Sequence, residues 1–136
     1  MKVAVVFSGG AARKAGDKVI EGAREAGAQV SVLKPGENTR DFDLVFLGWS
    51  ALFSFPKAFL KTVKESKAVC VFWVNVGFGN QLVKFVDAAV KENAKPRATF
   101  IVETAGPLRK IGLGTPSFES LIRLRGFAER NAAGSA

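Results

Sequence analysis

The chain of 136 residues offers few side chains that can perform acid–base, nucleophilic or redox chemistry. It contains no histidine and no tyrosine, and Cys70 is its one cysteine. The absence of histidine excludes an imidazole general base, a Ser–His or Cys–His nucleophile pair and histidine metal ligands. A lone cysteine excludes an internal disulfide framework and a multi-cysteine metal site. We therefore predict no catalytic side chain and no metal site, so that any redox chemistry must come from a cofactor.

A glycine-containing turn, Ser8–Arg13 (SGGAAR), is the first candidate for ligand binding. It follows an apolar run and leads into a helical pattern, where free backbone N–H groups and the helix dipole favour an anion. Gly9 and Gly10 would let a phosphate approach closely, while Ser8 offers a hydroxyl and Arg13 a positive charge. An equally good interpretation is that the two glycines only make a tight turn, since neither a GxxxxGK[ST] nor a GxGxxG motif is present.

Two further loops are unusual because they carry large aromatic residues. In 48–55, Trp49 is the best candidate for a wall that stacks on a ligand ring, whereas we expect Phe55 to pack on the following helix. In 75–80, Phe78 stands between two glycines, and Asn75 offers a polar group for ring edges. Phe78 could contact a ligand ring, but an equally good interpretation is that its side chain only covers the core.

Strand and helix signals alternate along the chain, and these elements must position the three loops. Strands are expected at 3–7, 29–33, 43–48, 68–74 and 97–103, and helices at 11–26, 56–65, 81–93 and 115–131, with loops at 34–42 and 104–114. Such alternation predicts an α/β fold with a parallel sheet covered by helices on both faces. The economical strand order is 2-1-3-4-5, which brings the three loops together at the switch in strand order. The nine residues of 34–42 can reach about 30 Å, just enough for the crossover that this order needs.

Three segments resemble the flavodoxin family: VAVVFSGG, FDLVFLGWSALFSFPKAFLKTV and KAVCVFWVNVGFGN. The resemblance covers essentially the whole chain and implies a flavodoxin-like three-layer sandwich that binds FMN. It implies that the first loop holds the phosphate and that the second and third loops enclose the flavin ring, with Trp49 as the inner wall and Phe78 where the family commonly has tyrosine. The cofactor-binding residues carried over by position are Ser8, Gly9, Gly10, Ala11, Ala12, Arg13, Gly48, Trp49, Ser50, Asn75, Val76, Gly77, Phe78 and Gly79.

The chain departs from the family pattern in two respects. The family's phosphate loop resembles Thr-x-Thr-Gly-Asn-Thr, whereas SGGAAR has a single hydroxyl. Typical flavodoxins are acidic, whereas this chain has 20 Lys and Arg against 12 Asp and Glu and a formal charge of +8. Two functions therefore stay open: a non-covalent FMN-binding electron carrier, or a flavodoxin-fold binding or regulatory module that has lost flavin and recognises another anion or an acidic partner. An FMN-dependent oxidoreductase component is compatible with the first.

Charge and hydropathy limit which partners and which cell compartment are expected for this protein. Lys57, Lys61 and Lys64 form a stripe at helical spacing that is either solvated or a contact surface for an acidic redox partner. No block of consecutive cations occurs, so nucleic-acid binding is not expected. No apolar stretch reaches the roughly 18 residues of a membrane span, and we expect a cytoplasmic protein. We expect one domain over 1–131 and a frayed tail over 132–136.

Overall fold

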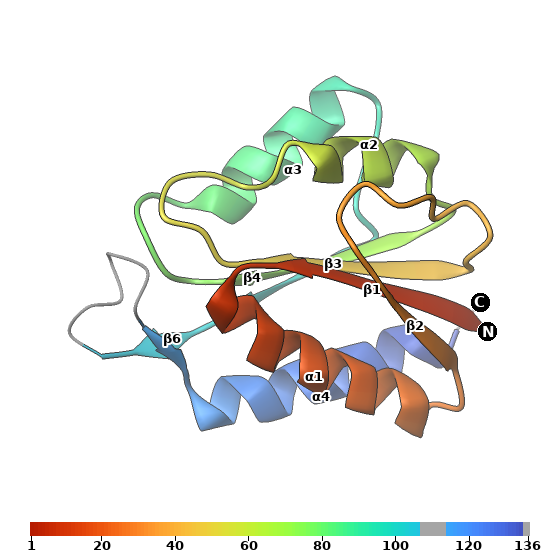
Figure 1. The fold of residues 1–136 in the computed structure, drawn as a ribbon, viewed down its shortest axis with the longest axis horizontal. Helices are drawn as coiled ribbons and strands as arrows, with labels where there is room; N and C mark the ends of the chain where they lie inside the picture. The colour runs from red at the N-terminus through yellow and green to blue at the C-terminus, as the bar shows by residue number, and fades with distance from the viewer. Residues whose placement is uncertain (107–113, 135–136) are drawn as a thin grey trace.

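A computed structural model describes residues 1–106 and 114–134 (Figure 1). The main sheet contains β1 (Lys2–Ser8), β2 (Gln29–Leu33), β3 (Leu44–Trp49), β4 (Val69–Val74) and β5 (Ala98–Val102). The helices are α1 (Gly10–Glu25), α2 (Ala58–Glu65), α3 (Gln81–Lys91) and α4 (Phe118–Ala132). A small hairpin joins β6 (Thr104–Ala105) to β7 (Thr115–Pro116).

The five strands are parallel and lie in the order β2-β1-β3-β4-β5, which confirms the order expected from the sequence. Register places Val5 beside Phe46, and Phe46 beside Cys70. Every residue of β3 and β4 is buried, because helices cover both faces of the sheet. This explains why these strands are continuous apolar runs rather than alternating patterns.

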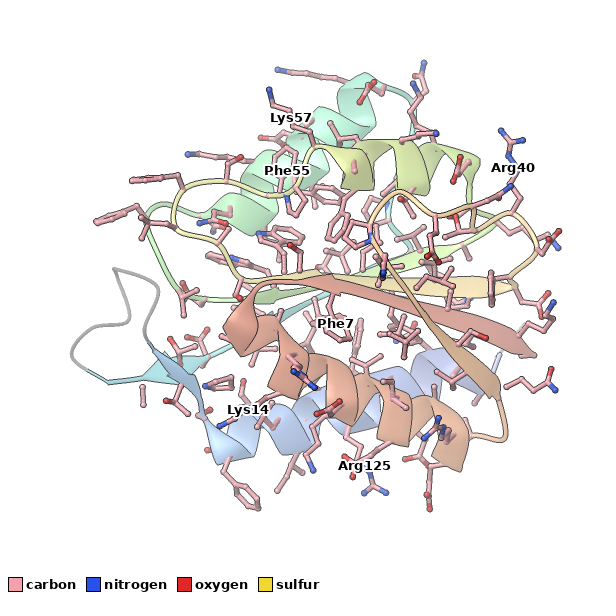
Figure 2. All side chains as sticks on the ribbon, in the orientation of Figure 1. Phe7, Lys14, Arg40, Phe55, Lys57 and Arg125 are labelled. Atoms are coloured by element: carbon pink, nitrogen blue, oxygen red, sulfur yellow. The ribbon has the colours of Figure 1, made fainter. Side chains whose placement is uncertain are left out.

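The three layers are plain in Figure 1, where α1 and α4 lie against one face of the sheet and α2 and α3 against the other. Alternate residues of each strand point into the two layers. One core layer joins strand residues to the small-residue stripe of α1 and to the inner face of α4. The other joins them to Phe59 and Val63 of α2 and to Leu82 and Phe85 of α3. Figure 2 shows Phe55 on the α2–α3 side of the sheet and Phe7 on the α1–α4 side.

The link from β2 to β3 crosses β1 without a helix, as the sequence predicts. At its end, Asp43 N–H donates to the Lys2 carbonyl over 2.8 Å, and Lys2 N–H donates to the Asp43 carboxylate over 2.8 Å. Thr39 is fully buried on this link, and its hydroxyl is hydrogen-bonded to the Ser66 hydroxyl just after α2. These bonds hold the crossing segment at its middle and at its end before β3.

The region after β5 differs from the sequence-based expectation. Thr104 pairs with Pro116 and Ala105 with Thr115, so part of the expected 104–114 loop and the expected start of the last helix form a hairpin instead. The last helix begins at Phe118, where the Ser117 hydroxyl accepts a hydrogen bond from Ser120 N–H. It continues to Ala132, one residue beyond the expected boundary, and Arg109 and Lys110 lie outside the described residues. Among the described residues, none of the helices has the length and apolar character needed to cross a bilayer.

Candidate ligand-binding site at the switch in strand order

The loops after β1, β3 and β4 meet at the carboxyl edge of the sheet, as expected. Ser50 N–H donates to the Ser8 carbonyl over 2.9 Å, which joins the first loop to the second. Phe78 N–H donates to the Leu52 carbonyl over 2.8 Å, which joins the second loop to the third. The topology thus brings the sequence-predicted segments into one site.

The N-terminus of α1 forms the anion-binding end of this site. Gly9 has a φ of +104°, and a Cβ there would lie 2.1 Å from the Ser50 carbonyl oxygen, so the close approach requires glycine. Gly9 provides no side-chain cap, and the Ser50 hydroxyl instead accepts a hydrogen bond from Ala12 N–H over 3.1 Å. Among the described residues, nothing accepts a hydrogen bond from the N–H groups of Gly10 and Ala11. Two donors of the helix terminus are therefore free for an anion.

A hollow of about 200 Å³ adjoins these donors and is lined by Gly10, Ala11, Ser50, Ala51, Leu52 and Val76. A Cβ added at Gly10 would meet nothing within 4 Å, so this side of the helix terminus is open. Drug-sized ligands usually occupy roughly 300–1,000 Å³. The hollow therefore suits a small anionic group better than a whole nucleotide.

Arg13 is exposed on the first turn of α1, while the Ala12 side chain is part of the core. Ala12 therefore offers the site no free group, because its backbone N–H already donates to the Ser50 hydroxyl. Ser8 is half-buried at the end of β1, and its carbonyl is used by Ser50.

Trp49 does not form a ligand wall in this structure, and that expectation is corrected. As the last residue of β3 it points into the α2–α3 layer, in register with Trp73, and it is fully buried. Its ring centroid lies 5.2 Å from that of Phe85 and 6.3 Å from that of Phe59. Its indole N–H donates to Gln81 Oε1 over 3.0 Å. Phe55 packs edge-on against both Trp49 and Phe85, so it joins the core as expected, but these contacts are with β3 and α3 rather than with the helix that follows it.

The exposed aromatic surface of the site comes instead from Phe53 and Phe78. Their side chains are 65% and 45% exposed, and their rings are stacked with centroids 5.6 Å apart and an interplanar angle of 14°. The sequence indicates Phe78 as a candidate but does not distinguish Phe53 from the other aromatic residues of 48–55. No local signal distinguishes Phe53, because an aromatic residue in a loop has the same sequence pattern whether it is buried or exposed.

The remaining expected residues divide between the site and its scaffold. Gly77 has a φ of +79°, and a Cβ there would lie 2.3 Å from the Leu52 carbonyl oxygen, so glycine permits the contact between the second and third loops. Val76 is buried beside the hollow, and Gly79 also has a positive φ. Gly48 faces the core and belongs to the scaffold, because a Cβ there would overlap the ring of the buried Phe72. The Asn75 amide reaches toward the Glu103 carboxylate over 3.4 Å, so its side chain joins the third loop to the end of β5.

Ionisable groups with clearly shifted pKa values lie outside the site. Burial raises the pKa of the Cys70 thiol, in the middle of the sheet, to about 11. The hydrogen bond from Lys2 N–H lowers the pKa of Asp43 from its ordinary 3.8. Within the described part of the chain, no group of three or more His, Cys, Asp and Glu residues is placed to hold a metal. The arrangement offers recognition by backbone donors and ring faces rather than acid–base catalysis.

Solved structures with the same architecture include several flavodoxins. A short-chain flavodoxin associated with a non-canonical PDU bacterial microcompartment superposes with a TM-score of 0.69 at 16% identity, over 98% of this chain and 99% of that one. A flavodoxin of Streptococcus pneumoniae TIGR4 gives a TM-score of 0.64 at 19% identity, over 98% and 99%. The two-electron reduced flavodoxin of Megasphaera elsdenii gives 0.63 at 16% identity, over 94% and 98%.

Neither a protein-family model nor the sequence of a curated protein matches the chain. The structural likeness nevertheless extends over nearly the whole chain, and the strand order agrees with it. The protein therefore has the flavodoxin-like fold.

Proposed function

We propose that the protein binds FMN non-covalently and serves as an electron carrier. The observation that carries the proposal is the exposed, stacked pair Phe53 and Phe78, whose loops adjoin the free N–H groups at the start of α1. The pair offers apolar faces to a flat ring, and the helix terminus offers donors to a phosphate. A phosphorylated planar ring system combines both requirements.

The residues fit the two ends of FMN in different ways. At the phosphate end, Gly10 and Ala11 supply N–H donors, and Gly9 removes side-chain bulk beside a hollow of about 200 Å³. At the ring end, the centroids of Phe53 and Phe78 are 5.6 Å apart. A flavin ring stacked between them would need about 7 Å, which is two stacking distances. Ring binding between Phe53 and Phe78 therefore requires their two loops to separate.

The redox chemistry would be that of the bound flavin, since the chain supplies no redox side chain of its own. The protein's part is to bind the phosphate, hold the ring and shield it from water. The formal charge of +8 favours the more negative, reduced form of a bound group, and so raises its reduction potential relative to that in an acidic protein.

Titration of FMN fluorescence with the purified protein tests this proposal. We expect quenching with a micromolar or lower dissociation constant, and a loss of affinity of roughly tenfold in Phe53→Ala and in Phe78→Ala, because each removes one stacking face. Phe118→Ala is the matched control, since Phe118 is 77% exposed on α4, outside the three loops of the site. Absence of quenching at micromolar FMN, or equal losses in all three variants, would contradict the proposal.

The alternative, a module that binds another anion without a flavin ring, is favoured by one observation. The Ser50 hydroxyl already occupies one donor of the α1 terminus, at Ala12 N–H. In that case inorganic phosphate would stabilise the protein against thermal unfolding, and neither Phe53→Ala nor Phe78→Ala would alter that stabilisation. The same two variants therefore separate the two functions.

A groove beside α2 suggests that a redox partner would be negatively charged. It has a volume of about 480 Å³, and Figure 2 labels Arg40 and Lys57 on either side of α2. Its lining is mostly cationic: Arg40, Lys57, Leu60, Lys61, Lys64, Glu65 and Glu92. Among the described residues, the one ion pair within it joins Lys64 to Glu92 over 3.4 Å. We propose that this surface contacts an acidic partner.

A further inference from the structure

Gln81, the first residue of α3, carries a fully buried amide beneath the site. Burial of an amide is costly unless its donors and acceptor are paired. Its Oε1 accepts from the Trp49 indole over 3.0 Å, and its Nε2 donates to the Ala51 carbonyl over 2.9 Å. A weaker bond runs from Nε2 to the Phe78 carbonyl over 3.4 Å. One side chain thus reaches the end of β3, the second loop and the third loop.

The two loops that Gln81 joins are those that carry the exposed rings. Ala51 lies two residues before Phe53, and Phe78 itself accepts the weaker bond. The same loops are also joined by the bond from Phe78 N–H to the Leu52 carbonyl. The indole that anchors Gln81 is immobilised among Phe55, Phe59 and Phe85 in the core. The hydrogen bonds of Gln81 therefore connect the loops of the ring pair to the tightly packed Trp49 side chain.

We propose that Gln81 is a positioning residue that holds the two loops together and so sets the gap between Phe53 and Phe78. Separation of the rings lengthens the path between the Ala51 and Phe78 carbonyls, both of which the same amide group holds. The gap can then open only as far as these bonds stretch or break. The inference rests on the proposed function only for the identity of the ligand, because the closed ring pair exists in the structure itself.

Hydrogen exchange of the Phe78 amide measures how often the two loops part. Gln81→Met replaces the amide by an apolar side chain of similar length, and we expect roughly tenfold faster exchange at Phe78 because the loops lose their common donor. The matched control is Asn80→Ala, the neighbouring residue in the third loop, which removes the cap that the Asn80 side chain provides for Val83 N–H but none of the hydrogen bonds of Gln81. We expect Phe78 to exchange at the wild-type rate in Asn80→Ala. The exchange rate of the buried Val71 amide should be unaffected by either change when the variants are compared at matched global stability.

The outcome is decisive in both directions. Faster Phe78 exchange in Gln81→Met alone supports the inference, whereas wild-type exchange, or an equal rise in Asn80→Ala, overturns it. If Gln81→Met does not fold, Gln81→Glu replaces it, because a carboxyl keeps an oxygen for the Trp49 indole and has at most one proton in place of two N–H groups. Faster Phe78 exchange in Gln81→Glu then supports the inference, and an unchanged rate overturns it.

FMN titration of the same variants adds a functional readout. We expect a several-fold change in the dissociation constant in Gln81→Met and none in Asn80→Ala. If the wild-type protein fails to bind FMN, the proposed function fails by itself, while the exchange experiment still decides the role of Gln81.

Discussion

Trp49 and Trp73 lie side by side in β3 and β4 and point into the same core layer, but their indole groups are paired differently. The Trp49 N–H donates to Gln81, whereas the Trp73 N–H is buried with no partner among the described residues. An unpaired buried donor already carries its desolvation cost in the folded state. The two residues therefore allow the value of one buried hydrogen bond to be measured within a single layer.

We expect Trp49→Phe to cost about 1–3 kcal/mol more stability than Trp73→Phe. Both changes leave a cavity, but only the first leaves the Gln81 oxygen unpaired, and the second removes a donor that has no acceptor. Urea unfolding of both variants measures the difference. Equal losses would show that the Gln81 bond contributes nothing beyond packing.

Cys70 is fully buried in β4, and burial raises its pKa to about 11 from the ordinary 9.0. Its thiol should therefore not react with a thiol reagent in the native protein at pH 7, and should react rapidly in urea. Because the folded pKa is the higher one, the Cys70 contribution to stability is fully present below pH 9 and is lost as the pH rises toward 11. Relative to Cys70→Ala, the wild type should lose about 2–3 kcal/mol over this range. A stability difference that stays constant with pH would contradict this assignment.

At the scale of elements, the crossing of α1 and α4 depends on Gly22. A Cβ at this position would lie 2.2 Å from the Arg125 carbonyl oxygen and 3.0 Å from Ala128 Cβ. The two helices are therefore packed with backbone nearly against backbone. Gly126, on α4, has no such constraint, because an added Cβ would meet only the flexible end of Arg130 at 3.2 Å.

We expect Gly22→Ala to destabilise the protein by about 1–3 kcal/mol, since the helices must move apart. Gly126→Ala should instead stabilise it by about 0.5–1 kcal/mol, because alanine has the higher helix propensity. The urea midpoints of the two variants should shift in opposite directions. Shifts of the same sign would show that helix propensity, rather than the crossing, governs both positions.

At the scale of the whole molecule, positive charge is concentrated in the segment that includes α2 and α3. Residues 57–97 contain eight Lys and Arg against three Asp and Glu, out of 20 and 12 in the whole chain. On α1, by contrast, Lys18 pairs with Glu21 over 2.9 Å. A surface with an excess of one sign accelerates encounter with an oppositely charged partner, and salt screens the effect.

For the FMN-loaded protein, electron transfer from an acidic ferredoxin should slow as ionic strength rises. The double variant Lys57→Glu with Lys61→Glu should lower the rate at low salt by roughly tenfold. Lys14→Glu with Arg24→Glu is the control, because it changes the net charge equally on α1. Stopped-flow kinetics measure the rates, and equal slowing by both pairs would mean that net charge, rather than the groove beside α2, guides the encounter.

The sequence by itself determined the architecture of this protein. Alternating apolar runs and amphipathic helices are local signals, and together with the length of 34–42 they led to the observed strand order. They also placed the three loops at one edge and identified Phe55 as a packing residue, because strand ends and helix starts are marked by glycine and proline. The membership of Phe53 in the ring pair was not visible, since an aromatic residue in a loop has the same local pattern whether it is buried or exposed.

Only the tertiary structure decided which aromatic and polar side chains face the ligand site. Trp49 turned into the core because its position in the strand register directs it to the α2–α3 face, where Phe59 and Phe85 surround it. Gln81 became the link between the loops because α3 begins directly beneath them, although in sequence it is merely the first residue of a helix. The bonds of Gln81 to Trp49 and Ala51 join residues that are 32 and 30 positions apart along the chain, and no local pattern encodes such a contact.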